Sequence, residues 1–388
     1  MIYLNAASTT SPSKEVLEDF MWCAKNVWAN PSDVSNEGYK AKQIIFHSQE
    51  QVAQYINAKP EEIVFTSGGS ESNNWAIKGF IDKNTSYKSI ITTQIEHPSV
   101  YNSCLFLKEK GYQVYYAPIN SFGEVSCFLL ESLIENNHIK RPFVSIMMTN
   151  NEIGTINDIA AISKIVKKYN GILHVDAVQA FGQISIDVEK MGIDLMSVSF
   201  HKFNGFKNSG FLYVRNGIEL TPLIHGGHQF NSRRSGTENV PMIYALGNQV
   251  ERMQLLGNGM KTKKVQELSD YLLEQIYSLS EQENINVYLN GAPINRLPNN
   301  LSLTFQGINA EKLITLLEEK GAIVSAGSAC SSGSKKPSRI LKAIGLSDEE
   351  AFSTIRISLG HDITVEDCDE FVRILGKCLR IIKMIGGD

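Results

Sequence analysis

Apolar runs alternate with segments of helical periodicity between residues 62 and 212, and this alternation constrains the fold more than any other feature of the sequence. Short apolar runs predict strands at residues 63–65, 90–91, 114–116, 144–148, 173–175 and 195–198. Between most of them, apolar residues recur at helical spacing, as in residues 70–80, 99–110 and 158–168. This order of elements predicts an α/β fold with a mostly parallel sheet covered on both faces.

The pattern changes after Pro241. Helical spacing and short apolar runs now follow one another irregularly: helices are expected at residues 242–256, 261–279, 310–319, 338–343 and 365–384, and strands near 287–288, 301–305 and 354–358. We therefore expect a large domain over residues 14–256 and a smaller α+β domain over 257–388. The first dozen residues can pack with either part, and we assign 1–13 to the smaller one. Residues 257–259, Gly-Asn-Gly, are the expected hinge.

Composition narrows the classes of function. With 388 residues, of which 43% are hydrophobic, the chain is neither a disordered tail nor a disulfide knot. A formal charge of −4 gives no global attraction to nucleic acid or to an anionic membrane, so we expect small-molecule or protein partners. The six cysteines form no CxxC pair, which fits reduced thiols. No signal-peptide pattern and no apolar stretch near the roughly 18 residues of a membrane span is visible, so we expect a cytoplasmic protein.

Polar residues follow three of the predicted strands. Gly69 and Ser70 follow the first strand and open a helix, where backbone amides and the Ser70 hydroxyl can bind a phosphate. His97 follows the second strand and precedes a helix, a position from which an imidazole can exchange protons with a ligand. Asp176 follows the fifth strand, where a carboxylate needs a cation or several donors. Taken alone, the turn at Gly69 and Ser70 is more often a simple helix cap, and His97 is more often a capping or core residue. For Asp176 alone, helix capping is an equally good explanation.

Lys202 follows the sixth predicted strand. An isolated lysine is usually solvated surface, but here its neighbours suggest a site. Pyridoxal phosphate (PLP) needs a lysine for its Schiff base, a carboxylate at the pyridine nitrogen and a cup for its phosphate. Lys202 and Asp176 match the first two requirements, and the third is matched by Ser70, Ser199 and His201.

Motifs in a fixed order run through nearly the whole sequence: Ile2-Tyr3-Leu4 with Thr9-Thr10, Asn30-Pro31-Ser32, Glu96-His97-Pro98, Asn150-Asn151-Glu152-Ile153-Gly154, Asp176-Ala177-Val178-Gln179, Ser199 with His201-Lys202, Gly226-Gly227-His228-Gln229, Arg233-Arg234-Ser235-Gly236-Thr237-Glu238-Asn239, Arg296-Leu297-Pro298-Asn299, Gly327-Ser328-Ala329-Cys330 and Thr354-Ile355-Arg356. With these motifs the sequence resembles the PLP-dependent cysteine desulfurases of the NifS/IscS type, on the class V aminotransferase fold. The segment ending at Cys330 separates desulfurases from aminotransferases of that fold. The resemblance implies a PLP-dependent transferase of fold type I, with a mostly parallel seven-stranded sheet and a smaller α+β domain that carries the catalytic cysteine.

The resemblance also implies roles around the cofactor ring. Lys202 would form the Schiff base, and Asp176 would pair with the protonated pyridine nitrogen. Gln179 would hydrogen-bond the 3-hydroxyl of the ring. His97 would stack on the ring and move protons.

Further implied contacts concern the phosphate and the substrate. The phosphate would be held by Gly69, Ser70, Ser199 and His201. Thr237 would reach the same phosphate from a neighbouring subunit, which makes a homodimer part of the site. Asn151 and Arg356 would hold the substrate carboxylate, because a planar guanidinium matches a carboxylate bidentately.

The implied reaction converts L-cysteine to L-alanine and leaves the sulfur on Cys330 as a persulfide. A protonated pyridine ring withdraws electrons, so the Cα proton of a bound amino acid becomes removable, and Lys202 is placed to move it. The small residues around Cys330 predict a mobile segment that passes sulfur to an acceptor protein, and Lys335 and Lys336 can ionise the thiol or attract an acidic partner. That acceptor would serve iron–sulfur cluster assembly or the thiolation of other molecules.

The sequence departs from the family pattern in several places. After the lysine the family reads Gly-Pro-Lys-Gly-x-Gly, whereas residues 205–210 read Gly-Phe-Lys-Asn-Ser-Gly. Loss of the Pro and one Gly changes the backbone conformations available to this loop, so we expect weaker cofactor binding or a specialised surface. Ser35, Asn5-Ala6 and His361 replace the usual His, Asp-Asn and Arg. These changes concern rate, selectivity and partners rather than the class of reaction.

Three other functions compete with this interpretation. Aminotransfer needs no thiol, so Cys330 argues against it, but it does not exclude selenocysteine lysis. A non-catalytic scaffold for sulfur-trafficking partners is disfavoured by the intact catalytic set. We expect no metal site, because His225 and His228 lack the helical spacing of a zinc pair and the cysteines are too dispersed to hold an iron–sulfur cluster.

Overall fold

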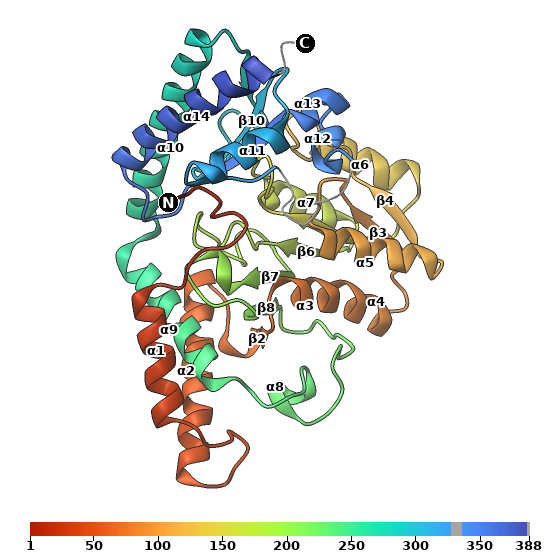
Figure 1. The fold of residues 1–388 in the computed structure, drawn as a ribbon. Helices are drawn as coiled ribbons and strands as arrows, with labels where there is room; N and C mark the ends of the chain where they lie inside the picture. The colour runs from red at the N-terminus through yellow and green to blue at the C-terminus, as the bar shows by residue number, and fades with distance from the viewer. Residues whose placement is uncertain (327–335, 386–388) are drawn as a thin grey trace.

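A seven-stranded sheet forms the centre of the computed structural model, which describes residues 1–326 and 336–385 (Figure 1). Its strands, in the order β2-β8-β7-β6-β5-β3-β4, are β2 (Ile63–Thr66), β8 (Gly210–Val214), β7 (Leu195–Ser199), β6 (Ile172–Asp176), β5 (Phe143–Met147), β3 (Ser89–Thr92) and β4 (Gln113–Tyr116). β8 is antiparallel to both of its neighbours, β2 and β7, and all the other pairs of neighbouring strands in this sheet are parallel. The predicted α/β fold with a mostly parallel seven-stranded sheet is confirmed.

All six strands predicted from apolar runs are present, and the seventh, β8, was not predicted as a strand. β8 returns antiparallel beside β7 after the short connection 200–209, with only the 3-10 turn η3 (Phe200–Lys202) between them. It therefore does not fit the alternation of strands with long helices that identified the others.

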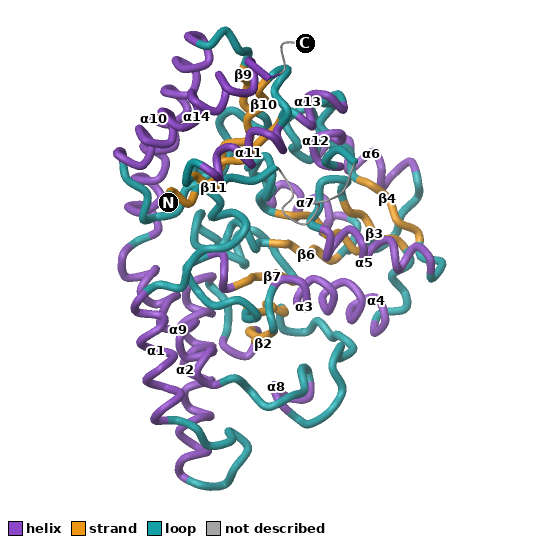
Figure 2. The backbone as a smooth tube through the Cα atoms, viewed as in Figure 1, coloured by secondary structure: helices purple, strands orange, loops and turns teal. Residues whose placement is uncertain are grey.

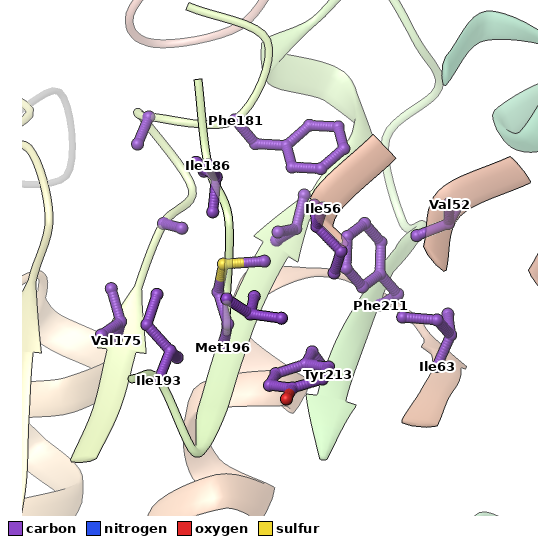
Figure 3. Packing of buried hydrophobic residues seen from close by; sticks show 14 of the residues in the cluster. Val52, Ile56, Ile63, Val175, Phe181, Ile186, Ile193, Met196, Phe211 and Tyr213 are labelled. Carbon is purple, nitrogen blue, oxygen red and sulfur yellow. The ribbon is translucent and has the colours of Figure 1, made fainter. Parts of the chain in front are cut away.

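Both faces of the sheet are buried. Ile63 and Phe65 belong to a cluster with apolar residues of α1 (Lys14–Asn26), α2 (Asn36–Ile56), α6 (Cys127–Asn136), α7 (Ile159–Lys168) and α9 (Val240–Leu256). Figure 3 shows part of this cluster, with Ile56 of α2 close to Phe211 of β8. Val64, between Ile63 and Phe65, instead packs with residues of a second set of helices: the π-helical turn η2 (Trp75–Gly79), which directly follows α3 (Gly69–Asn74), and the helices α4 (Phe80–Lys83) and α5 (Pro98–Glu109). Successive residues of a strand point to opposite faces, so helices cover both sides, as predicted.

The C-terminal part of the chain builds smaller sheets. An antiparallel sheet has the order β12-β10-β9, from β12 (Thr354–Ser358), β10 (Asn300–Phe305) and β9 (Val287–Leu289). The helices here are α10 (Asn258–Gln282), α11 (Ala310–Glu319), α12 (Arg339–Ala343), α13 (Asp348–Phe352) and α14 (Val365–Ile385). Gly257 alone separates α9 from α10, with a φ of 68°. The domain boundary and the hinge placed here stay predictions.

Residues near the N-terminus pack with this C-terminal part. β1 (Ile2–Tyr3) pairs in parallel with β11 (Ala322–Ile323), and Ile2 and Leu4 join the apolar cluster of the small sheets. Figure 2 shows the N-terminus next to β11. Two short elements complete the order, η1 (Pro60–Glu62) and α8 (Gln229–Ser232). In the described part of the chain no helix combines the length and apolar character needed to span a membrane.

Candidate active site

The predicted cofactor residues lie at the carboxyl ends of neighbouring parallel strands. Asp176 is the last residue of β6 and is paired in register with Ser197 of β7. Ser199 ends β7, and η3 then carries the chain to Lys202. Open parallel sheets bind ligands at this edge, because strand ends and helix N-termini face it together.

The segment Asn5–Thr10 crosses this edge and holds Lys202 and Gln179. The Lys202 Nζ donates to the carbonyl oxygens of Ala7 and Ser8, both at 2.7 Å. The Gln179 Nε2 donates to the same Ala7 oxygen at 2.9 Å. A single backbone carbonyl therefore fixes the amine and the amide side by side.

His201 is held by the same segment. Its Nδ1 lies 3.1 Å from the Thr9 Oγ1, and its carbonyl oxygen accepts hydrogen bonds from the Thr10 N–H and hydroxyl, both at 2.9 Å. Burial lowers the pKa of His201 to about 4. A neutral imidazole therefore stands here at pH 7.

A chain of hydrogen bonds connects Asp176 to His97. The Asn73 Nδ2 donates to the Asp176 Oδ2 at 2.8 Å and to the Ser99 Oγ at 2.9 Å, and Ser99 Oγ lies 2.7 Å from the His97 Nδ1. The Ser99 backbone N–H also donates to this Nδ1, so the pattern assigns the proton of the neutral ring to Nε2. Burial lowers the pKa of His97, which keeps Nε2 as its one donor at neutral pH.

Glu96, beside His97, is fully buried. Its Oε1 accepts hydrogen bonds from the Thr93 hydroxyl at 2.7 Å and from the Met147 N–H at 3.1 Å. Burial raises the pKa of Glu96 to about 8. This carboxyl is therefore largely neutral at pH 7.

A glycine turn approaches the ends of β6 and β7 closely. A Cβ added to Gly69 would lie 2.7 Å from Val178 Cγ2, and one added to Gly68 would lie 3.3 Å from the Ser199 Oγ. Ser70 is exposed beside this turn, and α3 starts here with no side-chain cap at its N-cap, Gly68. The structure thus brings Ser199 to the turn and leaves backbone amides for an anion.

Arg356 is buried in the middle of β12, with only 2% of its surface exposed. Its Nη1 donates to the carbonyl oxygen of Asn151 at 2.8 Å. Its Nη2 donates to the Asn5 Oδ1 at 2.9 Å and to the Ser8 Oγ at 2.7 Å. The two residues predicted to hold a carboxylate, Asn151 and Arg356, therefore touch each other beside the Lys202 segment.

The roles predicted for two residues are not tested by this arrangement. Thr237 is exposed and lines a cavity of about 220 Å³ with Ser67 and Asn208, and its predicted role belongs to a neighbouring subunit. Cys330 lies outside the described residues. Their roles stay predictions.

The loop after Lys202 accommodates the two residues that depart from the family pattern, Phe206 and Asn208. Asn208, where the family has Gly, adopts the left-handed conformation with φ 59°. Phe206, in place of Pro, packs its ring 5.0 Å from that of Phe20 on α1. Asn tolerates this region better than other non-glycine residues, so Asn208 adopts a conformation that is also open to the glycine it replaces.

Replacing Asn208 by Ala is expected to lower the free energy of unfolding by about 1 kcal/mol, because Ala has no local hydrogen bond to offset the left-handed backbone. Asn208→Gly should leave it within about 0.5 kcal/mol of wild type. Urea denaturation of the three proteins measures both values. Equal stability of the Ala variant and wild type would contradict this assignment of the conformation.

Sequence reasoning missed the residues that hold the site together. Asn73 links Asp176 to Ser99, and Asn5 and Ser8 hold Arg356. For the N-terminal segment, the motif of Ile2-Tyr3-Leu4 with Thr9-Thr10 and the departure at Asn5-Ala6 were noted, but neither pointed to a contact with Arg356. Asn73 carries no such signal, since an Asn within a helix is usually solvated.

The residues present fit PLP. Asp176 is 4% exposed, and its two hydrogen bonds come from neutral donors, the Asn73 amide and the Val178 N–H, so a protonated pyridine nitrogen would supply a cation for it. A lysine amine and an uncapped glycine turn complete the donor set. Within residues 1–326 and 336–385, no group of three or more His, Cys, Asp or Glu side chains is arranged to hold a metal ion.

Comparisons with known proteins agree with this geometry. Residues 2–371 match the family model of the aminotransferase class-V proteins. A cysteine desulfurase IscS of Dictyoglomus turgidum is 40% identical over 385 residues, which cover 99% of this chain and 96% of that protein. Among solved structures, a NifS-like protein is 33% identical with a TM-score of 0.90, covering 98% and 99% of the two chains. The structure of SspA in complex with cysteine is 36% identical with a TM-score of 0.80, covering 92% and 99%.

Proposed function

Because this chain belongs to the aminotransferase class-V family, whose cysteine desulfurases use PLP, we propose that it converts L-cysteine to L-alanine and transfers the sulfur to Cys330. The observation that carries the proposal is the meeting of Lys202, Asp176 and the Arg356 segment at one edge of the sheet. A relative solved with cysteine supports the choice of substrate.

When bound, PLP would withdraw electron density from the amino acid and so make its Cα proton acidic. Lys202 would hold the cofactor covalently, and Asp176 would keep the pyridine nitrogen protonated. Gln179 would bind the 3-hydroxyl. The phosphate would lie at the turn of Gly69 and Ser70, against Ser199 and His201.

Arg356 binds the substrate carboxylate in this proposal, with Asn151 beside it. Its guanidinium already lies against three neutral acceptors, the Asn151 carbonyl, Asn5 and Ser8, which fix its plane. A carboxylate is a natural ligand for a planar cation held in a fixed orientation.

Proton transfer is assigned to Lys202 and His97. The Lys202 amine, once displaced by the amine of the substrate, takes the proton from Cα. His97 donates from Nε2, since its Nδ1 already accepts hydrogen bonds from Ser99. Burial favours the neutral rings of both His97 and His201, so neither adds positive charge beside Lys202.

In the sulfur step, the Cys330 thiolate attacks the sulfur of the substrate. A sulfur–sulfur bond forms and the Cβ–S bond breaks, with its electron pair left on Cβ, which then takes a proton. The products are L-alanine and a persulfide on Cys330, so that atoms and electrons balance without an external reductant.

Two partners complete the proposal. Thr237 of a second subunit contributes to the phosphate site, so the enzyme acts as a homodimer. A sulfur-acceptor protein then receives the persulfide sulfur. This acceptor is an iron–sulfur scaffold or a thiolation enzyme.

Single-turnover formation of alanine tests this function. PLP-loaded wild type is expected to release about one alanine per active site from L-cysteine without added reductant, and to hold one persulfide. Cys330→Ala should form less than about a tenth of that amount. Cys127→Ala is the matched control. It removes a partly buried cysteine that is far from Cys330 in the sequence, and it should behave as wild type.

Two results would contradict the proposal. If Cys330→Ala made alanine and sulfide as well as wild type, the chain would be a lyase that needs no thiol. If wild type bound PLP and made no alanine from L-cysteine, the function itself would be wrong.

A further inference from the structure

Arg339 contacts the chain on both sides of His97. Its Nη2 donates to the carbonyl oxygen of Glu96 at 2.6 Å, and its guanidinium carbon lies 3.9 Å from the ring centroid of Tyr101. Glu96 directly precedes His97. The Tyr101 N–H donates to the His97 carbonyl oxygen at 3.0 Å in the first turn of α5. The guanidinium therefore bridges the residue before His97 and the helical turn that begins at it.

The first turn of α12, which carries Arg339, is itself fixed on the active-site segments. Ser338 caps this helix, accepting from the Ile340 and Leu341 N–H groups, and its hydroxyl donates to the buried Glu152 Oε2 at 2.6 Å. Glu152 directly follows Asn151, so the same turn is attached to the segment that flanks the carboxylate site.

Apolar packing holds α12 in the same place. Its residues Ile340 and Leu341, together with Ile344 directly after the helix, form a separate buried cluster with Ile95 and Ile153. Ile95 lies two residues before His97 and Ile153 two residues after Asn151. In Figure 1, α12 lies next to α13 and above α5. Arg339 thus reaches the His97 segment from a helix that is itself held by hydrogen bonds and apolar packing.

His97 depends on such support because only one side of its ring is fixed by its own helix. The Nδ1 atom is held by hydrogen bonds with Ser99. The direction of Nε2 depends instead on the conformation of the backbone at His97. A charged donor on a carbonyl and a cation over an aromatic face are both stronger than the corresponding neutral contacts. Loss of the guanidinium would therefore let the backbone at Glu96 turn and displace Nε2.

We propose that Arg339 is a positioning residue that aims His97 for proton transfer, acting through the Glu96 carbonyl and the Tyr101 ring. This inference rests on the proposed function. In this proposal Arg339 acts through its contacts with Glu96 and Tyr101 and not on the substrate directly.

Steady-state kinetics of alanine formation by the PLP-loaded protein tests the proposal. Arg339→Ala is expected to lower kcat about 10- to 100-fold with KM for L-cysteine nearly unchanged, since a displaced proton donor affects chemistry more than binding. Arg339→Lys, which keeps the charge and a donor for the Glu96 carbonyl, should recover a large part of the loss. Lys342→Ala is the matched control, because Lys342 lies on the same helix in an exposed ion pair with Asp348.

A double-mutant cycle separates positioning from general stability. In a His97→Ala background, Arg339→Ala should change kcat by less than about twofold, because the residue that it positions is absent. A second readout needs no cofactor: hydrogen exchange of the amides of residues 99–102 should speed up in Arg339→Ala and not in Lys342→Ala.

The proposal is overturned if Arg339→Ala matches Lys342→Ala in kcat and exchange, or if it lowers kcat equally with and without His97. Both outcomes presuppose an active wild type. A wild type that makes no alanine would instead refute the proposed function, and the exchange measurement would still report on Arg339.

Discussion

Lys202→Ala is expected to lower kcat for alanine formation by about 10⁴-fold, a larger loss than we expect from any other single substitution in the site. The amine has two tasks, to hold the cofactor covalently and to move the Cα proton, and alanine performs neither. Its position is specified by two carbonyl oxygens at 2.7 Å, those of Ala7 and Ser8. These acceptors orient Nζ and keep the lysine from rotating away.

Kinetics and cofactor retention check this result together. Purified wild type, Lys202→Ala and the control Lys207→Ala are loaded with PLP and dialysed, and the bound cofactor and kcat are measured. Lys207 is exposed, lies five residues later and should be dispensable. Retention of more than about a tenth of wild-type kcat by Lys202→Ala would rule out Lys202 as the proton-transfer group.

Arg356→Gln is expected to raise KM for L-cysteine about 100-fold with a smaller change in kcat. The guanidinium is nearly fully buried, so its bonds to a carboxylate form without competition from water and contribute more than exposed ones. Gln is shorter and neutral, and it cannot span from the Asn151 carbonyl to Ser8 as Arg356 does.

Removal of an arginine that donates several hydrogen bonds within the protein also costs stability, so the control is another arginine of this kind, one that is partly buried. Arg296 donates to the carbonyl oxygens of Asn290, Ala292, Ile153 and Asn300. Arg296→Gln should lower the melting temperature while leaving KM within about threefold of wild type. If Arg356→Gln showed the same pattern, with lower stability and unchanged KM, the substrate carboxylate would have to bind elsewhere.

The fold could be predicted because buried parallel strands appear in the sequence as short continuous apolar runs. Five of the seven central strands run in parallel beside a parallel neighbour and each had such a run. β8 contains an equally apolar run, but no helix separates it from β7, so the alternation did not reveal it. Tertiary packing, which the sequence pattern does not reveal, decides which strands β8 pairs with.

The site could be predicted in part for a related reason. Polar residues placed just after parallel strands meet at one edge whatever their distance in sequence, which brings Asp176 to the Lys202 segment. Asn73 and Arg339 follow no such rule. Each takes its role from a neighbour that only the packed structure supplies, namely Ser99 for Asn73 and Tyr101 for Arg339.

The segment that holds Lys202 and Arg356 has a consequence for biosynthesis. The Ala6 N–H and the Ala7 N–H bond the carbonyl and hydroxyl oxygens of Ser358, more than 350 residues later in the chain. On the ribosome these two N–H groups must therefore wait for their partner until nearly the whole chain has emerged. The large sheet can form while synthesis continues, but a nascent chain cannot complete its catalytic centre before residue 358 is available, so premature desulfuration by unfinished enzyme is avoided.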